Sequence, residues 1–264
     1  MAMQNLAPAG DFRTTYAADT VLFPTATGRG IALALAGAGA NVVIAARRKV
    51  TGDETAALIA REQGTALVVE CDVSVRTEVD AAVSAAVSTF GGLDLVVHNA
   101  VNREGGYSFA IQEVTDANWY AQASVAWDCA YFLAQAALPY LKRSGRGRFI
   151  MLGSCAGLHG SAMNPVYSAL KGGVRGFVKA LAREWGPYQI TVNAVEPVAA
   201  VDPSEVFFNQ SPQVVAQFMR NLPMGRLGRP REDIGRAVVA ICSDEFGFVT
   251  AQSIQVDGGL YTAV

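Results

Sequence analysis

The stretch RFIMLGSCAGLHGSAMNPVYSALK, residues 148–171, contains the change of pattern that decides the fold. Its beginning, Arg148–Ser154, is a continuous apolar run between polar ends, which is typical of a strand covered on both faces. An alanine-containing segment of helix length follows at Val166–Trp185, and a second apolar run follows at Ile190–Val195. This order predicts a strand–helix–strand unit with parallel strands.

The same alternation extends over about 230 residues. A strict strand–helix order over such a length is the pattern of a parallel sheet. The other predicted strands are Asn41–Ala46, Ala66–Glu70, Leu93–His98 and Ser253–Gly258. The other predicted helices are Ile31–Ala38, Gly52–Gln63, Arg76–Phe90, Asn118–Leu141 and Arg231–Ser243. We therefore expect an α/β fold: a single Rossmann-like domain over residues 19–264, with a doubly wound parallel sheet and helices on both faces.

Two segments fall outside this alternation. Residues 1–18 are rich in alanine and threonine and are expected to form a loose N-terminal arm. Residues 198–223 interrupt the alternation late in the chain. Insertions near strand ends often cover the ligand crevice of an open α/β sheet, so we expect this segment to cover the substrate.

Composition excludes several classes of function. The 264 residues are 51% hydrophobic and 17% charged, which predicts a globular chain, and the net charge of −2 gives no reason to expect nucleic acid as a partner. No apolar run is long enough for a membrane span, and residues 1–10 lack the pattern of a secretion signal, so we expect a cytoplasmic protein. Two histidines and four scattered cysteines without a CxxC pair predict no metal site, and the cysteines are expected to be buried hydrophobic residues.

The strongest chemical signal is a triplet. Ser154 ends a predicted strand, Tyr167 follows thirteen residues later, and Lys171 lies four residues beyond, on the same face of a helix. A nearby ammonium lowers the pKa of a phenol, so Tyr167 is a candidate general acid/base, and a serine hydroxyl at the strand end is placed to hold a substrate oxygen. A Tyr–Lys pair alone is also common on helix surfaces; the three-part spacing is more specific.

At these residues the chain resembles the short-chain dehydrogenase/reductase family, over about Val21–Gly259. The resemblance implies that Tyr167 is the general acid/base, that Ser154 orients the carbonyl, and that Lys171 lowers the tyrosine pKa and holds the cofactor ribose. It implies an oxidoreductase that interconverts a ketone and a secondary alcohol, a ketoreductase. It also implies a homo-oligomer, a tetramer or a dimer, formed through the long helices.

The resemblance also assigns cofactor-binding residues. It places Asp72 near the adenine, with Val73 next to it in the cofactor-binding set, Asn99 and Ala100 beside the cofactor, and Pro197 near the nicotinamide. Tyr167 and Lys171 also belong to this set of cofactor-binding residues. Arg47 and Arg48 end the second strand, where relatives that prefer NAD usually have an acidic residue, and guanidinium groups suit a 2′-phosphate. NADP(H) is therefore the expected cofactor, although two exposed arginines are also common on ordinary surfaces.

The expected cofactor site departs from the family pattern. The stretch TVLFPTATGRGIALALA, residues 20–36, has Gly28 and Gly30 where a longer glycine-rich loop is usual, and its Pro24 lacks an N–H donor. Further departures near the expected cofactor path are Val101, Ala126, Val198 and Asp202. The altered set leaves open a second hypothesis, a cofactor-independent enzyme of the same fold: a lyase, isomerase, cyclase or halohydrin-dehalogenase-like enzyme that uses Ser154 and Tyr167. A binding protein without catalysis is a third, which the complete triplet argues against.

The expected substrate is a small, hydrophobic molecule. His159, Met163 and Phe207 are the residues we expect to contact it, and they come from a larger set of side chains that could form an apolar wall. The other members of that set are Tyr107, Phe109, Phe208 and Phe218. Any of them could equally be ordinary packing residues.

Overall fold

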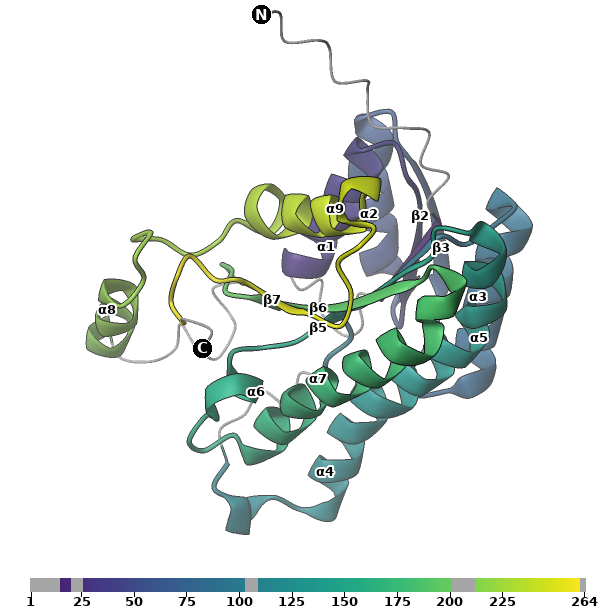
Figure 1. Cartoon of the computed structure of the whole chain (residues 1–264). Coiled ribbons are helices and arrows are strands. Elements are labelled where there is room, and N and C mark those ends of the chain that lie inside the picture. The colour runs from purple at the N-terminus through teal and green to yellow at the C-terminus, as the bar shows by residue number, and fades with distance from the viewer. Residues whose placement is uncertain (1–14, 20–25, 103–108, 201–211, 262–264) are drawn as a thin grey trace, which may run out of the picture.

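The fold is a parallel sheet between two layers of helices, as predicted, and the sheet has seven strands (Figure 1). The computed structural model describes residues 15–19, 26–102, 109–200 and 212–261. The strand order is β3-β2-β1-β4-β5-β6-β7. Strands β2 and β3 are added on one side of β1 and strands β4 to β7 on the other, so the order of the strands reverses between β1 and β4. The strands are β1 (Thr15–Asp19), β2 (Asn41–Ala46), β3 (Thr65–Glu70), β4 (Leu95–His98), β5 (Arg148–Leu152), β6 (Thr191–Pro197) and β7 (Ser253–Val256).

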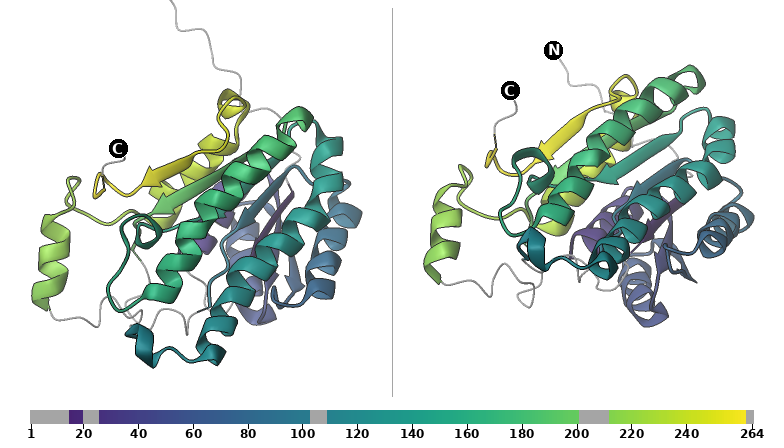
Figure 2. Two further views of the ribbon diagram at one scale, coloured as in Figure 1. Left: turned by 60° about the horizontal axis from the view of Figure 1, so that its bottom comes forward. Right: turned by 90° about the horizontal axis from the view of Figure 1, so that it is seen from below.

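The helices divide between the two faces of the sheet (Figure 2). They are α1 (Ala26–Gly37), α2 (Lys49–Arg61), α3 (Arg76–Phe90), α4 (Asp116–Ala123), α5 (Cys129–Ser144), α6 (Ala156–His159), α7 (Pro165–Trp185), α8 (Pro212–Arg220) and α9 (Arg236–Cys242). Helices α1, α2 and α9 contribute to one hydrophobic core, and α3, α5 and α7 contribute to the other. The central strands are therefore buried on both sides, which explains their continuous apolar sequences.

The alternation of side chains along β5 and β6 decides which residues reach each core. Phe149 and Met151 pack toward α7, whereas Ile150 and Leu152 pack toward α1 and α9. The two strands pair in parallel with Leu152 opposite Val195. The residues that follow each strand therefore emerge side by side at the carboxyl edge of the sheet.

One element differs from the sequence prediction. Residues 15–18, expected within a loose arm, form β1 together with Asp19, and this strand lies between β2 and β4. Its short TYAAD sequence lacks the run of valine and isoleucine that marks most of the other strands, and pairing with two neighbouring strands stabilises it instead. Residues 1–14 lie outside the described part of the chain.

Element boundaries differ in smaller ways. The predicted helix Asn118–Leu141 is an α4–α5 pair joined by a π-helical turn, Ser124–Asp128. The predicted helix Arg231–Ser243 begins as a second π-helical segment, η5 (Pro230–Gly235), before α9. Within the predicted covering segment the structure describes α8, while residues 201–211 lie outside the described ranges.

Gly30 explains how closely α1 packs against η5. It lies inside the helix, and an added methyl group would overlap the Pro230 carbonyl carbon and lie 2.6 Å from the Arg231 nitrogen. The absence of a side chain is therefore required by the contact between two backbones.

Gly30→Ala is expected to lower the free energy of unfolding by about 1–3 kcal/mol, because the backbone of η5 must move away from α1. Urea denaturation measures this value. Gly37→Ala is the matched control, since the nearest atom to its added methyl is the end of the Arg231 side chain at 3.4 Å. We expect the control to be neutral or stabilising by up to about 1 kcal/mol; equal destabilisation by both substitutions would contradict the packing role of Gly30.

Candidate active site

An open cavity of about 430 Å³ lies at the carboxyl ends of β4, β5 and β6. Ligands bind at this edge of open α/β sheets, next to the point where the strand order reverses. Its wall is formed by Thr27, Asn99, Val101, Leu152, Gly153, Ser154, Cys155, Ala156, Gly160, Ser161, Tyr167, Lys171, Pro197, Val198, Ala199, Phe218, Leu227 and Tyr261. The predicted triplet therefore meets at one cavity.

Ser154 reaches the cavity because β5 ends two residues earlier. Its Oγ accepts a hydrogen bond from the backbone N–H of Ala156 at 3.2 Å. A hydroxyl that accepts one bond still has a proton to donate. The serine can therefore hold an oxygen atom of a bound molecule.

Tyr167 and Lys171 come from the first two turns of α7. Pro165 begins this helix, a position where proline costs no hydrogen bond. The positive end of the helix dipole favours the anionic form of a phenol placed there. The Lys171 Nζ lies 5.7 Å from the centre of the Tyr167 ring and donates a hydrogen bond to the Leu152 carbonyl oxygen at 2.6 Å.

Burial dominates the electrostatics behind the triplet. Lys171 is only 4% exposed, and burial lowers its pKa to about 8, against the opposing effect of the Glu196 carboxylate. Burial and the Lys171 charge lower the pKa of His98 to about 4, so this imidazole is neutral at neutral pH. Lys171 consequently changes charge within a range of pH at which enzymes work.

Several predicted cofactor residues also reach the cavity. Asn99, which is 6% exposed, and Pro197 line it. Thr27, which was not predicted from the sequence, brings the first turn of α1 to the wall. Ala100 is instead buried in the core beneath β4. The departures Val101 and Val198 both lie in the wall, so their side chains reduce the space beside Asn99 and Pro197.

The remaining predicted cofactor residues lie along the same edge of the sheet, outside the cavity wall. Arg47 and Arg48 are exposed after β2, and Arg47 has no ion pair within the described residues. Asp72 follows β3 and accepts hydrogen bonds from the Ser74 N–H and hydroxyl, at 2.9 and 2.6 Å. Val73 is a core residue, and Gly28 is a buried residue of α1.

A family model described as enoyl-(acyl carrier protein) reductase matches residues 25–261. The short-chain reductase protein NovJ of Streptomyces niveus is 32% identical over 251 residues, which cover 91% of this chain and 94% of NovJ. The chain belongs to the short-chain dehydrogenase/reductase family. It is thus a member of a family of oxidoreductases.

Solved structures of other short-chain dehydrogenases/reductases agree with this assignment. A short-chain dehydrogenase/reductase of Brucella melitensis, titled glucose/ribitol dehydrogenase, superimposes with a TM-score of 0.84 at 28% identity, over 95% of this chain and 98% of the other. The 3-ketoacyl-(acyl-carrier-protein) reductase of the same organism, solved with NADH, gives a TM-score of 0.80 at 29% identity, over 94% and 98%.

The predicted substrate residues of this short-chain dehydrogenase/reductase have mixed positions. His159 is exposed at the end of α6, and its ring stacks on Tyr261 with centroids 4.3 Å apart, so it reaches the cavity only through that tyrosine. Met163 is 49% exposed and is absent from the wall. Phe207 lies outside the described residues, whereas Phe218 of α8 lines the cavity.

Among the residues at this site that sequence reasoning did not assign are Tyr261, Cys155 and Glu196. Tyr261 enters the wall because Asp257 accepts hydrogen bonds from the Gly259 and Tyr261 N–H groups, each at 2.9 Å. Cys155 is half-buried in the wall rather than part of a core, unlike the other three cysteines. Glu196 is buried behind the wall, and the only signal for it is a carboxylate inside an apolar strand.

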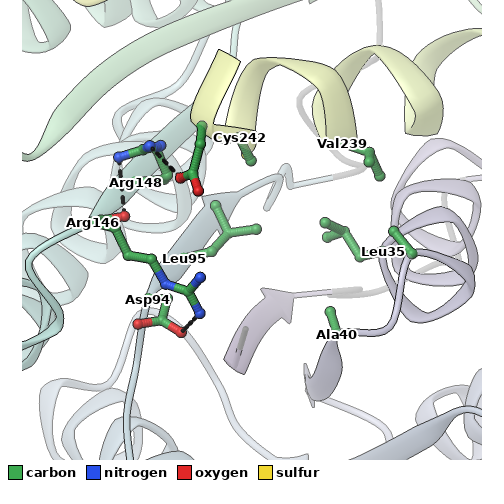
Figure 3. Close-up of a pocket in the computed structure, with 10 residues that line it drawn as sticks. Leu35, Ala40, Asp94, Leu95, Arg146, Arg148, Val239 and Cys242 are labelled. Carbon is green, nitrogen blue, oxygen red and sulfur yellow. Dashed lines mark hydrogen bonds and ion pairs between the residues drawn. The ribbon is translucent and has the colours of Figure 1, made fainter. Parts of the chain in front are cut away.

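A second cavity lies at the opposite, amino-terminal edge of the sheet (Figure 3). Its volume is only about 20 Å³, room for about one water molecule. Arg146 and Asp94 point toward each other across its rim, 3.3 Å apart. This space is too small for an organic substrate.

The described parts of the chain contain no helix with the length and apolar character needed to cross a bilayer. Nor do they contain a cluster of three side chains suited to hold a metal ion.

Proposed function

We propose that this short-chain dehydrogenase/reductase is an NADP(H)-dependent oxidoreductase that interconverts a ketone and a secondary alcohol, with Tyr167 as the general acid/base. The observation that carries the proposal is the meeting of Ser154, Tyr167 and Lys171 at one cavity, with the buried ammonium behind the phenol. Oxygen-holding, proton-donating and charged groups in one place suit the reduction of a carbonyl.

Each residue of the triplet has a separate task. In the reductive direction the Ser154 hydroxyl donates a hydrogen bond to the carbonyl oxygen and fixes its position. Tyr167 gives its proton to that oxygen as the carbon accepts a hydride, and the resulting phenolate takes a proton from water through the open cavity. The Lys171 ammonium stabilises the phenolate and so makes Tyr167 a stronger acid.

The residues along the carboxyl edge are compatible with a dinucleotide. Thr27 at the start of α1, Asn99 and Pro197 would contact the nicotinamide half, and Arg47, which has no ion pair within the described residues, would hold the 2′-phosphate. When bound, the cofactor supplies the hydride. The NADH in the ketoacyl reductase of Brucella melitensis supports a nicotinamide cofactor in a relative of this fold.

The wall on the other side of the triplet suits an apolar substrate. Val198, Phe218, Leu227 and Tyr261 contribute mainly apolar surface to the cavity wall. Such a wall favours a hydrophobic or cyclic ketone over a charged one, because a charged group would lose its hydration without gaining a partner there.

Arg47→Ala is expected to weaken NADPH binding about tenfold and to leave NADH binding unchanged, because only NADPH carries the 2′-phosphate that the guanidinium would bind. Titration of the dinucleotides by nicotinamide fluorescence measures both dissociation constants. A thermal-shift titration gives an independent value, since a ligand that binds the folded state raises the melting temperature.

Arg61→Ala is the matched control, because Arg61 is an exposed arginine at the far end of α2 and its removal changes the net charge equally. If neither NADPH nor NADH at millimolar concentration binds to the wild type or raises its melting temperature, the proposed function is overturned and the cofactor-independent alternative is favoured. Equal losses in both arginine variants would refute the role of Arg47.

A further inference from the structure

We propose that Glu196 is a positioning residue of the acid/base site: a buried countercharge that keeps Lys171 protonated behind Tyr167. The inference rests on the proposed function, because it assigns a purpose to the Lys171 ammonium. It adds to the triplet a fourth group, which lies behind the cavity wall and does not contact the substrate.

The strand geometry directs Glu196 toward α7. On β6, Val192 and Ala194 belong to the core beneath α7, whereas Val195 belongs to the opposite core. Alternation along the strand therefore points Glu196 to the α7 side, where Lys171 and Arg175 lie one turn apart. Glu196 is 2% exposed.

Gly153 leaves the space that the carboxylate occupies. The register that pairs Leu152 with Val195 places Gly153 beside Glu196. A methyl group added to Gly153 would overlap the carboxylate of Glu196. Glycine at this position thus allows the carboxylate to lie directly behind Ser154, at the floor of the site.

The carboxylate is buried without an ion pair in the described part of the chain. Both oxygens are buried without a hydrogen bond of good geometry, and Glu196 forms no ion pair shorter than 4 Å within the described residues. Burial raises its pKa to about 7, against the opposing charges of Lys171 and Arg175 and a weaker effect of the Ser154 backbone N–H. A carboxylate without an ion pair in such a position is costly to keep, which favours a role in the site over a role in stability.

Glu196 is also the countercharge that Lys171 needs. Besides the Leu152 carbonyl, it is the group that favours the charged form of this buried ammonium. His98 is kept neutral by burial and by the Lys171 charge, so it supplies no negative charge to Lys171. Cys155, after β5, faces the same carboxylate. Removal of the negative charge is therefore expected to release the Lys171 proton at a lower pH.

The test measures the ionisation of Lys171 directly. The chain has four lysines, so protein labelled with ¹³C at lysine Cε gives few signals, and Lys171→Met assigns one of them. We expect the Lys171 signal of the wild type to titrate near pH 8. Glu196→Gln should lower this midpoint by about one pH unit. Glu196→Asp keeps the negative charge on a side chain that is one methylene shorter, so it should lower the midpoint less.

A second readout separates this role from a purely structural one. If the midpoint falls by about one unit, the protonated fraction of Lys171 at pH 8 falls about fivefold. The kcat of Glu196→Gln for ketone reduction with NADPH should fall to the same extent at pH 8, recover to within about twofold of the wild type at pH 6, and change little in KM.

The outcomes are distinct. A Lys171 midpoint that is unchanged or raised in Glu196→Gln overturns the inference; if that variant does not fold, the same result in Glu196→Asp overturns it. An equal loss of kcat at pH 6 and pH 8 also overturns it. The NMR titration needs neither cofactor nor substrate. Absence of NADPH-dependent turnover would therefore refute the proposed function, and the titration midpoint of Lys171 would still show whether Glu196 keeps this lysine protonated.

Discussion

Replacing Tyr167 with phenylalanine is expected to lower kcat for ketone reduction by about 10²–10⁴-fold, the usual contribution of a positioned general acid. The substitution removes one oxygen atom from the cavity wall and leaves the ring in the first turn of α7. NADPH affinity and melting temperature should therefore change little. Steady-state kinetics with a hydrophobic cyclic ketone, together with a thermal-shift titration, measure the three quantities.

Tyr261→Phe is the matched control, because it removes the same atom from another tyrosine in the same wall. We expect its kcat to remain within a few fold of the wild type. If Tyr167→Phe keeps more than a tenth of the wild-type kcat, Tyr167 is not the proton donor and another group of the wall must be.

Lys171→Met is the second substitution with a large expected effect. It removes the ammonium that stabilises the Tyr167 phenolate, so kcat for reduction should fall about 100-fold. The pH profile should change too. Burial lowers the pKa of Lys171 to about 8, so the wild-type rate should fall as the pH rises through 8 and the ammonium loses its proton. The variant lacks that group, and its residual rate should show no such fall.

Lys179→Met is the control for loss of a positive charge on α7, because Lys179 is exposed two turns further along the helix. It should keep the wild-type rate and profile. A fall near pH 8 that persists in Lys171→Met would show that another group is responsible for it.

Much of the fold could be predicted from the sequence because the signals are local. The buried strands of a parallel sheet are continuously apolar, and β2, β4, β5 and β6 follow this rule. β1 does not follow it: its alanines and polar ends resemble an arm, and only pairing with two neighbours makes it a strand. A contact between distant residues decides that element, and a local pattern cannot show it.

The site divides in the same way. The spacing of Ser154, Tyr167 and Lys171 is local and predicted their meeting at a strand end. Tyr261 reaches the cavity through the turn around Asp257, more than a hundred residues from Ser154. Glu196 comes to lie beside Gly153, on the α7 side of the sheet, through the register of two strands. The sequence shows that an acidic residue stands in an apolar strand, but only the sheet shows which side chain it faces.

The role of Gly30 shows a second limit of sequence reasoning. Its neighbourhood in the chain suggests a phosphate-binding turn, but the structure gives the glycine a packing contact with Pro230, two hundred residues away. A phosphate-binding turn and a close helix contact both require glycine, because in both cases another group approaches the backbone closely. The sequence around Gly30 therefore cannot distinguish the two roles.

The central claim is tested most directly by tracing the hydride. NADPH carrying deuterium at C4, on the face from which transfer occurs, is incubated with the enzyme and a hydrophobic cyclic ketone, and the alcohol is analysed by mass spectrometry. We predict one deuterium at the carbinol carbon with the wild type, and at least about 100-fold less alcohol in the same time with Tyr167→Phe. Conversion of the ketone without NADPH, or an alcohol from the wild type that carries no deuterium with either C4 label, would contradict the proposed oxidoreductase.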